Sequence, residues 1–138
     1  MSRRPLFGRS LKPFRRPLLW SSLWCAAVAA VVALSLVTIP SPLEVPSGGD
    51  KVQHFVAYAA LSAGAVQLYR RWASLFSVAI ALVLMGIGLE YAQGALNPAR
   101  MADRMDALAN TLGVIAGLAT RLTPWSNALL RFDPRDDA

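Results

Sequence analysis

The chain has 138 residues, enough for one compact domain, and 55% of them are hydrophobic while 16% are charged. Soluble domains carry roughly 25% charged residues, so this composition, with a mean hydropathy of +0.42, favours a lipid environment. The net charge of +6 would suit nucleic acid, but six of the fourteen basic residues precede the first apolar segment. No basic stripe interleaved with aromatic residues follows, which argues against a nucleic-acid partner.

Residues 1–19 are basic and interrupted by proline, so we expect a disordered cytoplasmic arm that is drawn to anionic lipid. Residues 20–39, WSSLWCAAVAAVVALSLVTI, follow without a charge. They match the ~20 apolar residues of a membrane-spanning helix and exceed the ~7–15 of a signal peptide. No A-x-A-like cleavage site follows them. We therefore expect an uncleaved first helix rather than a cleaved signal peptide.

Three further apolar segments cover residues 52–69, 73–93 and 105–122. Prolines between residues 40 and 46 end the first segment, and Arg70 and Arg71 separate the second from the third. Asn97-Pro98 and Thr123-Pro124 end the third and the fourth, because a residue before proline disfavours the helical conformation. The sequence thus predicts an all-α integral membrane protein, with a four-helix bundle over residues 20–122 and a cytoplasmic tail over residues 123–138.

Lysine and arginine counts in the connecting segments predict the orientation. With the N-terminus in the cytoplasm, eleven basic residues lie inside and three outside, Lys51, Arg100 and Arg104. Positive residues collect on the cytoplasmic side, so both ends of the chain are expected there. In the tail, the helical spacing of apolar residues predicts either a short helix on the inner membrane surface or a frayed end. These residues are Leu122, Trp125, Leu129 and Phe132.

Polar residues gather where three of the segments reach the outer side. Asp50, His54 and Tyr58 are four positions apart and therefore share a helix face. Similar stripes mark the third and fourth segments, where glycines let helices approach closely. We expect the stripes to meet, either as a network that only holds helix ends together or as a functional site. The candidate pocket residues are Asp50, Lys51, His54, Tyr58, Glu90, Gln93, Arg100, Asp103, Asp106 and Asn110, and the candidate packing residues are Gly86, Gly113 and Gly117.

These residues also carry a family resemblance. DKVQHFVAY, LEYAQ, an arginine followed by DRMD, and NTLGVIAG occur in order, and together they resemble the pattern of the VanZ-like family. The resemblance covers roughly residues 18–122. It implies a small multi-pass protein of the bacterial inner (plasma) membrane, and the namesake of the family is linked to low-level teicoplanin resistance. The resemblance therefore implies a location and a phenotype, but it does not imply a particular reaction.

The first function hypothesis is a cell-envelope binding protein. Its outer pocket would hold the headgroup of a lipid-linked cell-wall precursor or an anionic phospholipid, and Lys51, Arg100 and Arg104 would meet phosphate. The first alternative is a membrane enzyme that acts on a lipid phosphate through His54 and the carboxylates. The second is a purely structural or interaction protein.

Other functions have less support in the sequence. The chain has one histidine and no H-x-x-x-H, G-x-S-x-G or glycine-rich phosphate loop, so we predict no metal and no cofactor. Transport is disfavoured because four short helices are few for alternating access and no internal repeat is visible. Gly113 and Gly117 form a G-x-x-x-G pair that suits either a homodimer or packing within one chain.

Overall fold

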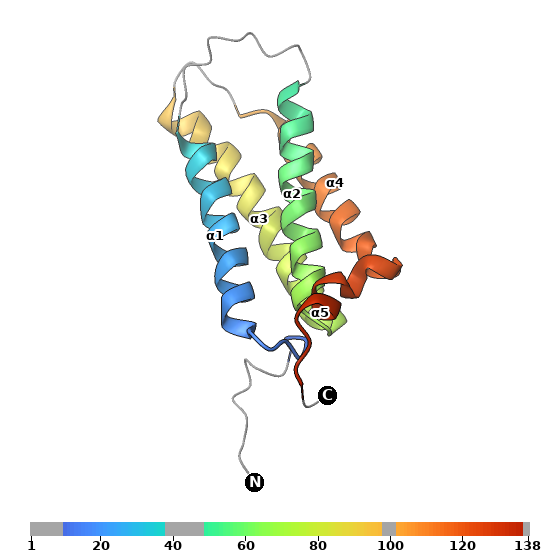
Figure 1. Ribbon diagram of the computed structural model, residues 1–138. Helices are drawn as coiled ribbons and strands as arrows, with labels where there is room; N and C mark the ends of the chain where they lie inside the picture. Colours follow the sequence, from blue (N-terminus) through green and yellow to red (C-terminus); the bar gives the residue numbers. More distant parts are fainter. Residues whose placement is uncertain (1–9, 38–48, 98–101, 137–138) are drawn as a thin grey trace.

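The computed structural model describes residues 10–37, 49–97 and 102–136 (Figure 1). In this part the chain forms five α-helices, which confirms the all-α prediction. They are α1 (Pro17–Leu36), α2 (Gly49–Leu68), α3 (Trp72–Leu96), α4 (Arg104–Ala119) and α5 (Ala128–Phe132). Two 3-10 helices, η2 (Thr120–Leu122) and η3 (Pro124–Asn127), connect α4 to α5.

The helix ends differ from the predicted bounds for local reasons. α1 begins at Pro17 rather than at residue 20, because proline is compatible with the first helical turn. α2 begins at Gly49, so Asp50 and Lys51 lie inside its first turn, where the positive end of the helix dipole favours an aspartate. α4 ends at Ala119, and the chain tightens into η2 before Thr123-Pro124 stops it.

The four long helices alternate in direction, so α2 and α4 run parallel (Figure 1). They also make the closest helix pair in the molecule. A Cβ atom on Gly113 would lie 2.4 Å from the Phe55 carbonyl oxygen, and one on Gly117 would lie 2.4 Å from the Ala59 carbonyl oxygen. The G-x-x-x-G pair therefore packs α4 on α2 within one chain, because any side chain there would force the backbones apart.

Buried apolar side chains join α2, α3 and α4. One cluster contains Tyr58, Leu61, Leu82 and Val114, all less than 5% exposed. A second cluster contains Ala65, Val66 and Leu75, near the C-terminal end of α2 and the N-terminal end of α3. Each large side chain buried in this way adds van der Waals contacts between the helices. The core is therefore built around α2.

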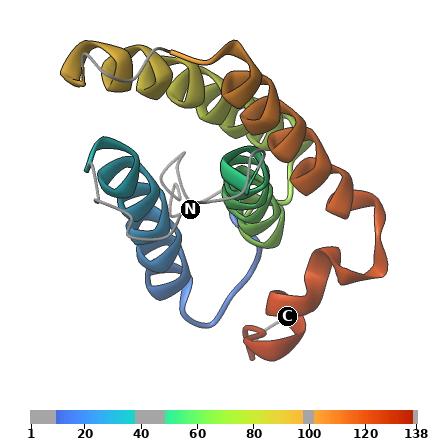
Figure 2. The same cartoon turned by 90° about the horizontal axis from the view of Figure 1, so that it is seen from above.

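α1 is peripheral to this core. Seen from above, α1 and α4 lie on opposite sides of α2 (Figure 2), and none of the residues of α1 is buried. Among the described helices, α1 and α3 are long and apolar enough to span a membrane, a criterion that the core helix of a soluble protein or a signal sequence also meets. α2 and α4 do not meet it, so the structure supports two of the four expected spans by length and composition.

The N-terminal segment before α1 is tied to the C-terminal segment. Lys12 is 4% exposed and donates hydrogen bonds to the carbonyl oxygens of Val66 and Ser126. Asp133 accepts hydrogen bonds from the Arg16 backbone N–H (2.9 Å) and from Trp20 Nε1 (2.8 Å). We call this set the terminal clasp: Lys12, Arg16, Trp20, Ser126 and Asp133.

The clasp corrects one prediction. We expected residues 1–19 to be disordered, but residues 10–19 are placed, while residues 1–9 lie outside the described part. Phe14, which is 1% exposed, supplies a buried anchor, and the backbone N–H of Lys12 donates to the Leu68 carbonyl oxygen. A basic arm can fold back in this way when a lysine can bury its aliphatic stem and satisfy its ammonium group with carbonyl oxygens. Of the two alternatives for the tail, a short helix is present, as α5.

Candidate functional site

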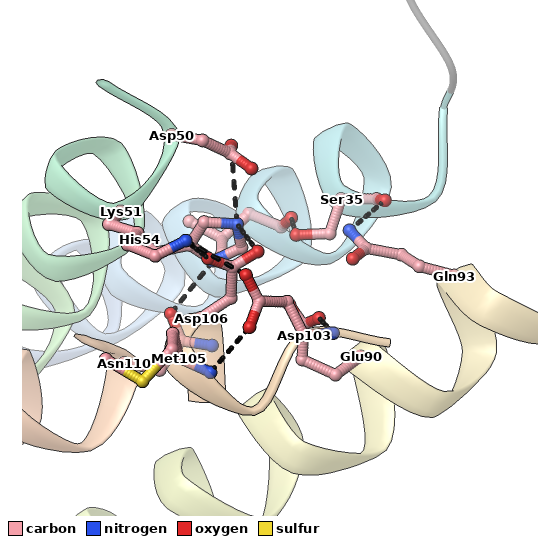
Figure 3. Close-up of polar contacts among 11 residues, drawn as sticks. Ser35, Asp50, Lys51, His54, Glu90, Gln93, Asp103, Met105, Asp106 and Asn110 are labelled. Atoms are coloured by element: carbon pink, nitrogen blue, oxygen red, sulfur yellow. Dashed lines mark hydrogen bonds and ion pairs between the residues drawn. The ribbon is translucent and has the colours of Figure 1, made fainter. Parts of the chain in front are cut away.

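The polar residues predicted from the sequence meet at one end of the bundle, where α2 and α4 begin and α1 and α3 end (Figure 3). Local sequence explains the two helix starts. Asp103 precedes α4 as its N-cap and accepts a hydrogen bond from the Met105 backbone N–H (2.8 Å). Asp50 and Asp106 occupy the first turns of α2 and α4. Carboxylates stabilise helix N-termini, so both helices favour negative charge at this end.

Lys51 links α2 to the start of α4. Its Nζ lies 2.9 Å from Asp103 Oδ2 and 3.4 Å from Asp106 Oδ1. The hydrogen bond with Asp103 raises the pKa of Lys51, and the same bond lowers the pKa of Asp103. The Lys51 and Asp103 side chains are about 40% exposed, so solvent screens this pair, whereas Asp106 is buried. Removal of Lys51 would therefore affect the buried aspartate more than the exposed one.

His54 lies one helical turn below Asp50 and faces α4. Its Nδ1 lies 3.0 Å from Asn110 Oδ1, a distance that fits a hydrogen bond. Its Nε2 lies 3.6 Å from Asp50 Oδ1 and 3.9 Å from Asp106 Oδ2. Asn110 is 2% exposed, and a Cβ atom on Gly86 would lie 3.0 Å from its Nδ2, so α3 packs directly behind it.

Three of these side chains have the composition and spacing of metal ligands. Asp50, His54 and Asp106 each offer one ligand atom, and these atoms lie within 4.8 Å of one another. A tetrahedral ion with bonds of ~2.0–2.1 Å holds its ligand atoms ~3.4 Å apart, so the three side chains would have to move closer together to bind one. Lys51 opposes a cation here, because its ammonium group already lies 3.4 Å from Asp106.

Glu90 and Gln93 extend the polar cluster along α3. Glu90 is 5% exposed, and its Oε2 lies 3.4 Å from the Asp103 backbone nitrogen, which donates to it. Gln93 is 7% exposed and donates through Nε2 to the Ser35 carbonyl oxygen on α1 (2.6 Å). In Figure 3, Gln93 therefore reaches α1 while Glu90 faces the start of α4. Within the network four carboxyl groups accompany one lysine, Lys51.

A pocket of about 310 Å³ opens between these helix ends. Its polar lining comes mainly from α2, with Gln93 of α3 and Ser35 of α1, and Val31 and Leu34 of α1 add an apolar wall. Two buried polar atoms on its lining residues, the Tyr58 hydroxyl and Gln93 Oε1, have no hydrogen-bond partner among the described residues. An unsatisfied buried polar group costs about 1–3 kcal/mol. Such atoms can be satisfied by a buried water or by a polar group of a ligand. The polar lining residues are Ser35, Asp50, Gln53, His54, Tyr58 and Gln93.

The structure places nine of the ten candidate pocket residues, and Arg100 lies outside the described part. Six of the nine form the network around Lys51 and His54, and Glu90 joins it through the Asp103 backbone. Tyr58 and Gln93 lie on the pocket wall instead. Sequence reasoning missed Ser35 and Gln53. Ser35 was a weak signal, a single hydroxyl in the last turn of an apolar segment.

No protein-family model matches the chain, and neither a curated protein nor a solved structure matches it.

Proposed function

We propose that this chain is a small multi-pass membrane protein that binds the polar headgroup of a lipid in the pocket between the ends of α1, α2 and α3. Membrane embedding is supported by α1, an apolar helix of twenty residues in which no residue is buried. Large apolar side chains also face outward on the other helices: Leu84 is 63% exposed and Ile115 is 57% exposed. Soluble monomers rarely expose apolar surface so extensively, so a lipid solvent accounts for it best.

We also propose that all four long helices span the membrane and that both described ends of the chain lie in the cytoplasm. α2 and α4 carry their ionisable residues in their first two turns, near the interface, where a charge costs less than at the bilayer centre. α5 and η3 keep Trp125 and Phe132 more than 70% exposed, which suits a tail lying on the inner surface.

We also propose that the chain is related to the VanZ-like proteins of the bacterial plasma membrane and that it affects teicoplanin susceptibility. This proposal is supported by the meeting of four sequence motifs at one end of the bundle. The four motifs contribute His54, Glu90, Asp106 and Asn110 to one cluster, although they are spread over more than fifty positions of the chain.

The observation that carries the binding proposal is the pair of buried, unpartnered polar atoms on Tyr58 and Gln93. Together with Asp50, they offer hydrogen-bond acceptors, and the Tyr58 hydroxyl can also donate. Four carboxyl groups against one lysine make the cluster a poor site for a bare phosphate. Hydroxyl groups of a lipid-linked precursor suit it better. The sequence assigns Arg100, which lies outside the described residues, and Arg104 to an anionic part of such a lipid.

Native mass spectrometry of the detergent-purified protein tests this proposal. Tyr58→Phe removes only the unpartnered hydroxyl, so the protein should unfold at an unchanged or higher temperature. Its affinity for the co-purified lipid should fall about tenfold, the loss expected for one buried hydrogen bond of roughly 1.4 kcal/mol. Tyr91→Phe, on the 72% exposed tyrosine of α3, is the matched control. Equal lipid retention by wild type, Tyr58→Phe and Tyr91→Phe would rule out the pocket as the binding site.

A metal-dependent membrane enzyme is the second candidate, and the convergence of Asp50, His54 and Asp106 favours it. Zinc is the ion best matched to one imidazole and two carboxylates. Wild-type protein exposed to Zn²⁺ alone and then passed through a desalting column would retain stoichiometric zinc, and His54→Gln would not. If both proteins emerge without zinc, the cluster is a hydrogen-bonded network and this alternative is rejected.

A further inference from the structure

A second cavity lies between α1, α2 and α5. It is an open groove of about 630 Å³ with almost entirely apolar walls. Trp20 and Trp24 line it from α1, Leu61 from α2, and Leu129 and Phe132 from α5. Among the described residues that line it, Gln67 is the only polar side chain apart from the two indoles. The groove therefore offers little to hold water.

The groove and the polar pocket lie on the same helix faces. On α1 the groove is lined by residues 20, 23, 24 and 27, and the pocket by residues 31, 34 and 35, which continue the same three-and-four spacing. On α2 the pocket is lined by residues 50, 53, 54, 57 and 58, and the groove by residues 60, 61, 64, 67 and 68. The two cavities therefore follow each other along one seam between α1 and α2.

The length of this seam indicates what kind of ligand it could hold. From Ser35 to Trp20, fifteen residues at ~1.5 Å each give about 22 Å along α1. One leaflet accounts for about half of the ~30 Å hydrocarbon layer. The seam thus extends from a polar end, past the depth of one leaflet, to α5 near the opposite end of the molecule. A single long hydrocarbon chain with a polar head matches both its chemistry and its length.

The contact between the helices explains why the groove stays open. Trp24 Nε1 donates to the Leu61 carbonyl oxygen (2.9 Å), and the Trp24 ring packs over Gly64, where a Cβ atom would lie 2.8 Å from Trp24 Cδ1. The clasp holds Trp20 at the end of α1. Trp24, Val28 and Val31 of α1 pack partly buried against the core, but no residue of α1 is fully buried, so the contact between α1 and α2 is incomplete.

We propose that the groove binds the hydrocarbon chain of the lipid whose headgroup occupies the polar pocket. The ligand class is therefore a long-chain lipid with a hydroxyl-bearing head, held with its head at Tyr58 and Gln93 and its chain between α1 and α2. This inference rests on the proposed function, because the groove and that pocket are lined by the same faces of α1 and α2.

Photo-crosslinking tests the inference on the full chain in detergent, with a long-chain primary alcohol that carries a diazirine near its chain end. Crosslinks should map to residues 20–27 and 60–68. Ala27→Trp, which fills the groove, should lower this labelling at least fivefold, whereas Ala26→Trp, on the neighbouring face of α1, should not change it. Ala60→Phe fills the opposite wall and replaces Ala27→Trp if that variant does not fold.

Two results would overturn the inference. One is labelling spread evenly over the exposed faces of α1 and α3 and unchanged by Ala27→Trp and Ala60→Phe, as expected for lipid that merely surrounds the protein. The other is a crosslinked dimer, which would assign the groove to a second copy. The headgroup pocket is tested separately with Tyr58→Phe. If Ala27→Trp blocks the labelling but Tyr58→Phe leaves it unchanged, the headgroup proposal is rejected and the chain site is kept.

Discussion

At the scale of single residues, the most unusual environment belongs to Lys12. The residue is 4% exposed, and its ammonium group donates hydrogen bonds inside the clasp. Burial, and secondarily the positive charge of Arg121, lower the pKa of Lys12 to about 8. A lysine in this position can release its proton on folding and still donate two hydrogen bonds, to Val66 and Ser126.

The lowered pKa predicts a rise of stability in alkaline solution. Between about pH 8 and pH 10.5 the unfolded chain holds a proton on Lys12 that the folded chain has lost, so the free energy of unfolding increases with pH. The increase should be roughly 3 kcal/mol relative to Lys12→Met across this interval. Denaturant unfolding of both proteins at several pH values measures it. Parallel stability curves for the two proteins would contradict the prediction.

Lys51 should behave in the opposite way, because its pKa is raised by its hydrogen bond to Asp103. Its contribution to stability is complete below the ordinary lysine pKa and is lost only as the pH rises through the higher folded value. Lys51→Met therefore serves as the comparison for Lys12→Met. Across the same pH interval the difference between wild type and Lys51→Met should not grow in favour of the wild type.

At the scale of helices, the close approach of α4 to α2 depends on two glycines. Gly113→Ala would place a methyl group 2.4 Å from a backbone oxygen of α2, which side-chain movement cannot relieve. We expect it to destabilise the fold by about 1–3 kcal/mol. Gly88→Ala on α3 meets nothing within 4 Å and should be neutral or stabilising by up to about 1 kcal/mol, because alanine favours the helix. Thermal unfolding of both variants in detergent compares them, and equal effects would refute the packing argument.

Much of the helix arrangement could be predicted from the sequence, because periodicity and proline positions report it directly. The four-residue spacing of Asp50, His54 and Tyr58 indicated one helix face, and in the structure all three line the same pocket. The register of α2 against α4 could not be predicted, since it is fixed by where Gly113 and Gly117 meet Phe55 and Ala59. Sequence spacing constrains positions within a helix and not between helices.

The role of α1 was the other part that sequence reasoning could not supply. The uniform apolar run of residues 20–39 has no polar stripe that would identify its inward face. The structure shows that Ser35 and Val31 border the polar pocket and that Trp20 and Trp24 border the groove. The clasp was hidden for a similar reason. Lys12 looked like one more basic residue of the arm, and burial of a lysine depends on carbonyl oxygens that only the folded chain brings near it.

At the scale of the whole molecule, the described N-terminal and C-terminal segments lie together at the end opposite the polar cluster (Figure 1). In a Cys25→Ser background, cysteines at Ser10 and Arg135 should therefore react with a membrane-impermeant maleimide from one side, and a cysteine at Ala102 from the other. The native Cys25, exposed on α1, should be protected in intact vesicles and react after solubilisation in denaturing detergent. Reaction of all four positions from one side would contradict membrane spanning.

The clasp has a consequence for the order in which the molecule assembles. Its hydrogen bonds join residues 113 to 117 positions apart, whereas the pairs between α2 and α4, such as His54 with Asn110, are 52 to 56 positions apart. Contacts between distant residues form late unless intervening contacts have shortened the loop between them. Trp24 of α1 and Leu61 of α2 are 37 positions apart, so we expect the four long helices to pack first and the clasp to close last, when Ser126 and Asp133 reach the N-terminal segment. The clasp is then the final part of the molecule to form, and the α5 wall of the groove is added after α1 and α2 have packed.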